Sequence, residues 1–263
     1  MKKLERAELA IIGGTGLEEL IKEGKKVRVG TPYGPSPQIT IGKIGEWSVA
    51  FLPRHGIMHE VPPHKINFRA NIWGLKSLGV SRIIATNAVG AINERFKPGD
   101  FIIPVDIIDF TKTRSFTFYD EAPVTHIDLT EPYCPILLNL LVKCAKKHSE
   151  RVFTNAVLAC TEGPRYETPS EIKMFKMLGC DIVGMTGAPE LFLARELEIC
   201  YATICFVSNM AAGLQKRLTV DEVKAIANKI APKLKEILLD AILYMPKERN
   251  CSCGFALEKA RIT

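Results

Sequence analysis

Short apolar runs that end in glycine or polar turns alternate with segments of helical period along most of this chain. A strand buried on both faces gives a continuous apolar run, and an amphipathic helix gives apolar residues three or four positions apart. We expect strands at residues 9–12, 38–44, 47–53, 82–88, 101–104, 105–110, 152–160, 182–185 and 199–207. We expect helices at residues 66–78, 136–148, 169–178, 189–197 and 219–244. This alternation predicts an α/β fold.

The alternation continues along the chain without a linker, a change in composition or an internal repeat. A length of 263 residues is enough for one large α/β domain. We therefore expect a single domain over residues 1–263, in which residues 247–263 form a loosely held tail after the last helix.

Composition and charge exclude several classes of protein. The net charge of +6 is spread along the chain, whereas nucleic-acid-binding proteins usually concentrate basic residues in a stripe or a run. The apolar run at residues 9–12 is too short for a signal peptide, and no run reaches the roughly 18 residues of a membrane-spanning helix. We expect a cytoplasmic protein that binds neither nucleic acid nor membranes.

The eight cysteines form no C-x-x-C pair, so the usual zinc-binding signature is missing. Most of them lie in apolar runs, where a free cysteine behaves as a small hydrophobic residue. Cys251 and Cys253 are different, because they lie one residue apart in the polar tail. They are either two solvated thiols or a redox pair that forms a disulfide. His59, Glu60 and His64 do not have H-E-x-x-H spacing, and two prolines prevent the helix that such a site needs, so we predict no metal site.

Two motifs that follow strands could bind an anion. In Gly13-Gly14-Thr15-Gly16, successive backbone N–H groups can converge on phosphate, although the segment also suits a simple tight turn. Arg54 and His55 follow the strand at residues 47–53, and the planar donors of arginine match phosphate oxygens. An Arg-His pair alone is equally compatible with an ordinary surface position. Both motifs lie where open α/β sheets bind ligands.

Three further segments also follow strands and could bind a flat heterocycle or its sugar. Tyr166 could stack on a ring and Glu167 could accept a hydrogen bond from it, although an acid here also suits the start of a helix. Thr186 lies between a strand and a helix start. Asn209, at the end of another strand, can both donate to and accept from a base edge, or serve as a simple turn residue.

Taken together and in this order, these segments resemble the trimeric purine nucleoside phosphorylase family, and within it the methylthioadenosine/methylthioinosine phosphorylase branch. The resemblance extends from about residue 9 to residue 245. It rests on IIGGTGL, PRHG, HKINFRANIWGLKSLG, ATNAVGAI, KPGDFIIP, SFTFYD, TEGPRYET, DIVGMTGAPE and LARELEICYATI. It implies a single-domain, three-layer α/β/α fold with a mixed central sheet. It also implies an enzyme that uses phosphate to cleave purine nucleosides, and a homotrimer or homohexamer with shared active sites.

The resemblance assigns roles to the residues that match the family's motifs. The phosphate-binding residues would be Thr15, Arg54, His55, Asn87, Ala88 and Thr186. The nucleoside-binding residues would be Tyr166, Glu167, Met185, Asn209, Ala211 and, lent by a neighbouring subunit, His126. Asn209 and Glu167 would also act in catalysis, by stabilising the leaving purine. The reaction would need no cofactor, because inorganic phosphate is a co-substrate.

Two positions indicate which purine is used. Methylthioadenosine phosphorylases have Asp-x-Asp where this chain has Asn209-Met210-Ala211, and a small hydroxyl residue where it has Glu167. A 6-oxopurine has an N1 proton that a carboxylate accepts and an O6 that an amide donates to, whereas adenine presents a bare N1 lone pair. We predict S-methyl-5′-thioinosine as the substrate, with general inosine or guanosine phosphorolysis, or methylthioadenosine phosphorolysis, as alternatives. Near the 5′ group, Glu222 favours a hydroxyl and Val223 a methylthio group.

Two other classes remain as alternatives. A nucleoside hydrolase would use water and an aspartate-rich calcium site near its N-terminus, but the first aspartate here is Asp100. A non-catalytic nucleoside-binding protein would not need phosphate ligands, yet Thr15, Arg54 and Thr186 are all present.

Overall fold

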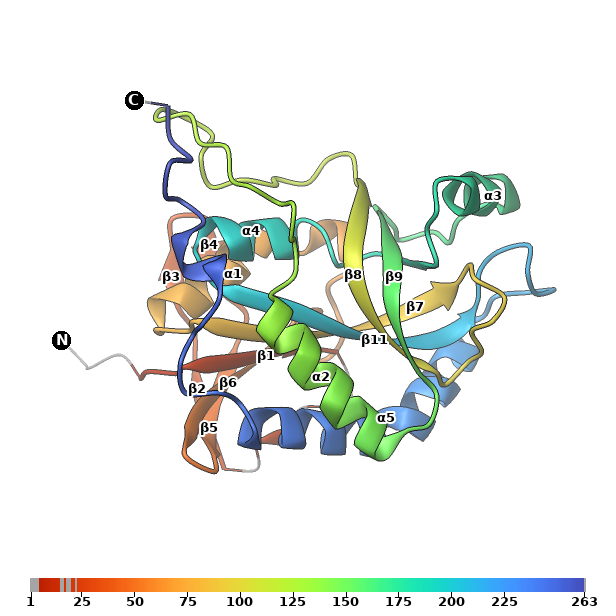
Figure 1. The fold of residues 1–263 in the computed structure, drawn as a ribbon, viewed down its shortest axis with the longest axis horizontal. Helices are drawn as coiled ribbons and strands as arrows, with labels where there is room; N and C mark the ends of the chain where they lie inside the picture. The colour runs from red at the N-terminus through yellow and green to blue at the C-terminus, as the bar shows by residue number, and fades with distance from the viewer. Residues whose placement is uncertain (1–4, 15–16, 18–19, 22, 263) are drawn as a thin grey trace.

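The computed structural model describes residues 5–14, 17, 20–21 and 23–262, and its centre is a nine-stranded mixed sheet (Figure 1). The strands of this sheet are β1 (Leu9–Gly13), β2 (Lys25–Val27), β5 (Ile39–Ile44), β6 (Trp47–Pro53), β7 (Arg82–Ala91), β8 (Phe101–Phe110), β9 (Val152–Thr161), β10 (Ile182–Gly184) and β11 (Cys200–Met210). Their spatial order is β10-β9-β8-β11-β7-β1-β6-β5-β2. A separate hairpin pairs β3 (Gly30–Thr31) with β4 (Gly34–Pro35).

The middle of the sheet is parallel. Strands β6, β1, β7 and β11 run in the same direction and are buried on both faces, which explains why their sequences are continuous apolar runs. Strand β10 also pairs with β7, antiparallel, and this pairing closes β7, β11, β8, β9 and β10 into a ring of five strands. The ring brings residues from distant parts of the sequence to one end of the sheet.

Helices cover both faces of the sheet (Figure 1). On one face, α2 (Pro135–His148) and α5 (Val220–Leu243) contribute to one hydrophobic cluster. On the other, α1 (Phe68–Ser77) and α4 (Glu190–Glu196) contribute to a second. Helix α3 (Pro169–Met177) follows β9 in the chain, and two short 3₁₀ helices, Pro63–Lys65 and Ser252–Phe255, lie in loops. The expected single-domain, three-layer α/β/α fold with a mixed sheet is confirmed.

Several expected elements differ from the structure: strands β2, β3 and β4 were not expected, and other bounds shift by a few residues. Two of the differences have a local physical cause. The two strands expected at residues 101–104 and 105–110 form the single strand β8. Its register against β9 shifts on both sides of Pro104, which has no N–H to give to a ladder, so the apolar pattern changes phase there. The helix expected from residue 189 begins one residue later, because Pro189 is its N-cap.

The tail was also expected to be loosely held, and this too was wrong. Arg82 donates from Nη2 to the carbonyl oxygens of Pro246 (3.1 Å) and Lys247 (2.8 Å), and Arg249 donates to the carbonyl oxygen of Glu198 (2.7 Å). Cys253 is buried. Tertiary hydrogen bonds therefore fix a segment whose polar composition alone predicts no packing.

Among the described helices, none combines the length and the apolar character that a membrane crossing requires.

Candidate active site

The candidate site lies at a gap beside the central strand β7. Strand β1 pairs with β7 as far as Ala85, and on the same side β10 pairs with it at Gly90 and Ala91. Residues 86–89 therefore have β11 on one side and, within the described part of the chain, no strand on the other. Of the ten residues of β7, only Ala88 is exposed. The gap thus opens the middle of the sheet to solvent beside a predicted phosphate-binding residue.

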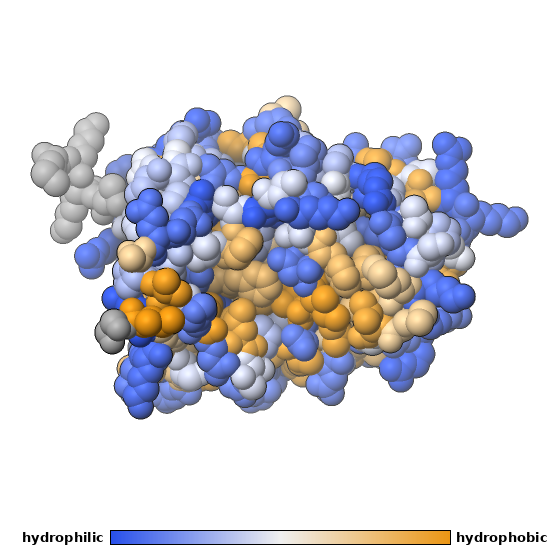
Figure 2. Space-filling view, turned by 90° about the horizontal axis from the view of Figure 1, so that it is seen from above, coloured by the Kyte–Doolittle hydropathy of each residue, from blue (hydrophilic) through white to orange (hydrophobic). Residues whose placement is uncertain are grey.

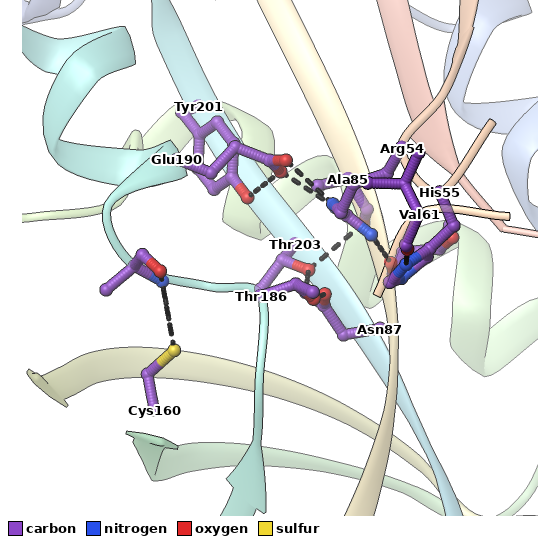
Figure 3. A network of polar contacts seen from close by, with 12 residues as sticks. Arg54, His55, Val61, Ala85, Asn87, Cys160, Thr186, Glu190, Tyr201 and Thr203 are labelled. Carbon is purple, nitrogen blue, oxygen red and sulfur yellow. Dashed lines mark hydrogen bonds and ion pairs between the residues drawn. The ribbon is translucent and has the colours of Figure 1, made fainter. Parts of the chain in front are cut away.

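The guanidinium of Arg54 lies against this gap. Its Nη1 donates to the carbonyl oxygen of Thr86 (2.9 Å), while Nε and Nη2 donate to the two carboxylate oxygens of Glu190, each at 2.7 Å (Figure 3). Burial would lower the pKa of Arg54, but the charge of Glu190 and its hydrogen bonds to the guanidinium together more than offset this effect, so the pKa rises above its ordinary value. Each Nη group keeps one further N–H beyond these bonds. Arg54 is therefore a fixed cation with two donors left for an anion.

The glycine turn after β1 meets Arg54 through the backbone. The N–H of Arg54 donates to the carbonyl oxygen of Gly13 at 3.0 Å. A Cβ on Gly13 would lie 2.9 Å from Leu17 Cδ1, so side chains pack closely around this residue. Thr15, the predicted phosphate-binding hydroxyl in this turn, lies outside the described residues.

His55 is held as a neutral imidazole. Its Nδ1–H donates to the carbonyl oxygen of Val61 at 2.8 Å, and its ring stacks on that of His59 with centroids 4.5 Å apart. Burial, followed by the charge of Arg54, lowers the pKa of His55 to about 4. At neutral pH its Nε2 is therefore an acceptor, which can face a protonated phosphate oxygen but cannot donate to an ionised one.

A chain of buried polar side chains crosses β7 from Thr186 (Figure 3). The Thr186 hydroxyl donates to Asn87 Oδ1 (2.6 Å), and Asn87 Nδ2 donates to Thr203 Oγ1 (2.7 Å). The Thr203 hydroxyl in turn donates to the carbonyl oxygen of Ala85 (3.1 Å). Because each of these hydroxyl and amide donors has an acceptor, the series of hydrogen bonds fixes the position of the Thr186 hydroxyl, which lies in the segment after β10.

Asn209 lies at the other end of the gap. Strand β11 bulges at Ser208, so that Asn209 comes level with Gly90 of β7. A Cβ on Gly90 would lie 3.2 Å from Asn209 Nδ2. The amide orientation is determined by its partners: Nδ2 donates to the carbonyl oxygen of Met210 (2.9 Å), which can only accept, and Oδ1 accepts from the Ser208 hydroxyl (2.6 Å). One N–H of Asn209 is left for a ligand.

Glu167 and Tyr166 approach from the loop after β9. The Thr161 hydroxyl donates to Glu167 Oε1 at 2.6 Å, so one carboxylate oxygen is used to orient the side chain and Oε2 stays available. Tyr166 is 36% exposed, and burial together with the charge of Glu167 raises its pKa. Met185, after β10, lies under this loop: a Cβ on Gly163, whose φ is +64°, would be 2.7 Å from Met185 Sδ. These three residues form one wall of the site.

Two predicted residues do not join this group within the chain. Ala211 is buried, and its N–H donates to the carbonyl oxygen of Ala91 at 2.8 Å, so it supports the end of β7 from behind. His126 lies in the long loop between β8 and α2, with its side chain exposed and its N–H donating to the carbonyl oxygen of Ala260 at 2.8 Å.

Sequence reasoning missed two residues that organise the site. Glu190 is completely buried and pairs with Arg54, and the Tyr201 hydroxyl also donates to it at 2.8 Å. Glu190 is the last residue of the segment Gly184–Glu190. It was missed because an acidic residue at a helix start is already explained by its favourable interaction with the helix dipole. Arg114 donates to the carbonyl oxygens of Ala188 (2.6 Å) and Glu162 (2.7 Å), and so ties the two loops together. Nothing local distinguishes Arg114 from a surface arginine.

Comparison with known proteins identifies the family of this chain. The profile described as the phosphorylase superfamily matches residues 8–243. The chain belongs to this superfamily. A probable S-methyl-5′-thioinosine phosphorylase of Methanopyrus kandleri is 49% identical over 257 residues, which cover 97% of this chain and 99% of the relative. A 6-oxopurine nucleoside phosphorylase of Pyrococcus furiosus is 49% identical over 96% of this chain and 98% of its own length.

A solved structure is also similar. A methylthioadenosine phosphorylase from an antarctic soil metagenomic library matches with a TM-score of 0.93 and 33% identity, covering 98% of this chain and 93% of its own. This chain is therefore an enzyme of the phosphorylase superfamily, and the expected family resemblance is confirmed.

Proposed function

We propose that this enzyme catalyses phosphorolysis of a 6-oxopurine nucleoside, with S-methyl-5′-thioinosine as the preferred substrate. The products are hypoxanthine and 5-methylthioribose 1-phosphate. The bond between C1′ of the sugar and N9 of the purine breaks, and its electron pair leaves with the base. A phosphate oxygen forms the new bond to C1′. The observation that best supports this proposal is the buried Arg54, charged and with free donors, beside the gap in the sheet.

Phosphate would bind in the gap along residues 86–89. Arg54 offers two N–H donors whose position does not depend on the ligand, because Glu190 and Thr86 fix the guanidinium plane. Thr186 and the backbone at Ala88 complete this side of the pocket. Donors that are oriented before phosphate arrives stabilise the ion pair between phosphate and the cationic sugar of the transition state.

The purine would be bound by Asn209 and Glu167. Glu167 Oε2 would accept the N1 proton of hypoxanthine, and the remaining N–H of Asn209 would donate to O6 or N7, where negative charge develops as the base leaves. Adenine has no N1 proton, so an ionised Glu167 would face a lone pair. This mismatch supports a 6-oxopurine, as do the printed names of the two relatives that are 49% identical.

The choice between a methylthio and a hydroxyl group at the 5′ position depends on the residues at the start of α5. Glu222 Oε2 accepts from Gln215 Nε2 at 2.9 Å, and Gln215 Oε1 accepts from the N–H of Met210. The carboxylate is therefore engaged in holding the loop before α5, and we propose that Val223 rather than Glu222 faces the 5′ group. An apolar neighbour favours methylthio over hydroxyl.

A neighbouring subunit would complete the site. His126 lies in a loop with exposed apolar residues, among them Phe116 and Val124, and Ile262 of the tail is exposed beside it. Figure 2 shows a face on which hydrophobic residues form a broad area bordered by polar ones. Exposed apolar areas of this kind mark interaction surfaces. We propose a homotrimer or a homohexamer in which His126 reaches the next subunit's nucleoside.

Kinetics on four nucleosides test the proposed function. Inosine, adenosine and their 5′-methylthio forms combine two bases with two sugars. We expect base release to require phosphate, and kcat/KM for methylthioinosine to exceed that for methylthioadenosine by roughly 10³ or more, because an unmatched hydrogen bond in a built site is strongly selected against. A preference for adenine would contradict the assignment of the base, and release without phosphate would contradict phosphorolysis itself.

A further inference from the structure

Four cysteines from three distant parts of the chain meet on the face opposite α4. Cys134 is the N-cap of α2, Cys200 is the first residue of β11, and Cys251 and Cys253 lie in the tail. Their four Sγ atoms all lie within 4.8 Å of one another, and Cys200 Sγ is 3.4 Å from Cys251 Sγ. Three of the four thiols are buried and Cys251 is half-buried. No residue of the proposed active site belongs to this cluster.

The distances between the sulfur atoms of the cluster are close to those in a tetrahedral zinc site with four thiolate ligands. Zinc binds four thiolates tetrahedrally at about 2.3 Å, so its sulfur atoms lie about 3.8 Å apart. The distances here fall on both sides of that value. With four protein ligands and little access for solvent, such a site leaves no position for a substrate, which is typical of a structural rather than a catalytic centre.

We propose that Cys134, Cys200, Cys251 and Cys253 bind one zinc ion as tetrahedral thiolates, and that this ion attaches the tail to the sheet. Soft thiolate ligands in a tetrahedral arrangement favour zinc over magnesium, calcium or manganese. The prediction of no metal site rested on the missing C-x-x-C pair and on the unsuitable spacing of His59, Glu60 and His64. The cluster instead combines a C-x-C pair with two remote cysteines.

Two arginines lie next to the cluster and would compensate its charge. Four thiolates and one zinc ion carry a net charge of −2, which requires neighbouring cations in a buried place. Arg82 donates to the carbonyl oxygens of Pro246 and Lys247 just before the C-x-C pair, and Arg249 belongs to the tail itself and donates to the carbonyl oxygen of Glu198, two residues before Cys200. Arg249 Nε is buried and has no hydrogen-bond partner among the described residues. Cys134 also precedes the first turn of a 14-residue helix, where the helix dipole favours a negative charge.

The zinc site would order more than the four cysteines. Beyond it, the tail bridges the loop between β8 and α2: Thr125 pairs with Arg261, and the N–H of Ile262 donates to the carbonyl oxygen of Val124 at 3.0 Å. Releasing the metal would therefore free both the tail and this loop, and both should become sensitive to proteases.

Metal analysis tests the proposal without reference to activity. Wild-type protein purified under reducing conditions, without chelator, should retain about one zinc ion per chain after dialysis against metal-free buffer. The Cys251→Ser/Cys253→Ser variant should retain at least tenfold less. Cys144→Ser is the matched control: Cys144 is also buried on α2 but lies outside the cluster, so this variant should keep its zinc.

Cobalt substitution of the wild-type protein tests the geometry independently of any variant. Co²⁺ in place of zinc should give thiolate-to-cobalt charge-transfer bands and the intense visible bands of a tetrahedral centre. The proposal is overturned if the reduced wild-type protein retains no zinc and shows no such bands with Co²⁺. It is also overturned if non-reducing mass spectrometry shows that these cysteines are paired as disulfides and hold no metal.

Discussion

The bidentate pair of Arg54 and Glu190 is the residue-scale feature on which the proposed phosphate site depends. A buried arginine needs a partner of opposite charge, and a buried carboxylate needs hydrogen-bond donors. Glu190 meets both needs, because it accepts two bonds from Arg54 and one from the Tyr201 hydroxyl. It would not touch phosphate, so we describe it as a positioning residue.

Glu190→Gln should therefore weaken phosphate binding selectively. The amide keeps one acceptor but faces Arg54 with a competing N–H, so the guanidinium loses its fixed plane. We expect KM for phosphate to rise about tenfold, which corresponds to loss of one charge-assisted hydrogen bond, while KM for the nucleoside changes little. Tyr201→Phe, which leaves the ion pair intact, is the control. Equal changes in both KM values would indicate general structural damage instead.

His55 makes stability depend on pH. Its pKa is about 4 in the folded protein, below the value of about 6.5 expected in the unfolded chain. The unfolded state therefore binds the proton first as the pH falls, so the stabilising contribution is complete above about pH 6.5 and is lost towards pH 4, by at most ~3 kcal/mol. Urea denaturation across this range should show a flatter profile for His55→Asn than for the wild type. Parallel profiles would exclude His55 as the cause.

The preference for one purine base over another should depend on the side chains of Asn209 and Glu167. In the variant Asn209→Asp/Glu167→Ser, the acceptor for N1–H is lost and a carboxylate near N7 and the exocyclic group is gained. The ratio of kcat/KM for methylthioadenosine to that for methylthioinosine should rise by about 10² or more. The single variants show whether the two changes act independently. An unchanged ratio would mean that other residues select the base.

At the scale of elements, the site exists because neighbouring strands have unequal lengths. Strands β7 and β11 continue past the end of β1, and β10 joins β7 only after a gap. The loop after β9 carries the proposed purine-binding residues, and its direction is determined by the start of α3. There Thr168 Oγ1 accepts from the N–H of Glu171, and Glu171 Oε2 accepts from the N–H of Thr168.

Thr168→Ala should disturb both stability and the neighbouring Glu167. Loss of the cap should lower the free energy of unfolding by about 1 kcal/mol. Because Thr168 follows Glu167 directly, KM for the nucleoside should rise more than KM for phosphate. Thr168→Ser, which keeps the capping oxygen, should restore both values. If the Ser variant behaves like the Ala variant, the capping bond is not what positions this loop.

At the scale of the whole molecule, the ring of five strands and the anchored tail determine which residues lie on the surface. The loop with His126 is held against the tail, because Thr125 pairs with Arg261 and the N–H of His126 donates to the carbonyl oxygen of Ala260. Complementation between variants can test the proposal that a second copy completes the site.

Mixing two inactive variants should restore activity if sites are shared. His126→Ala and Arg54→Ala chains, unfolded and refolded together, would form mixed oligomers. One site in about four should then combine an intact Arg54 with an intact His126 from its neighbour, so about a quarter of wild-type activity should return. Each variant refolded alone should stay inactive. Full activity of the His126→Ala protein would show that the loop makes no contribution.

The sequence alone determined the α/β alternation, nearly all the strands and the segments that surround the site, because side-chain periodicity and turn chemistry act over a few residues. Only the tertiary structure decided which distant residues meet. Arg54 and Glu190 are 136 residues apart, and the cysteines of the tail reach β11 across the fold. Strand order and register create these contacts. No local pattern encodes them, because each partner alone is compatible with an ordinary surface or core position.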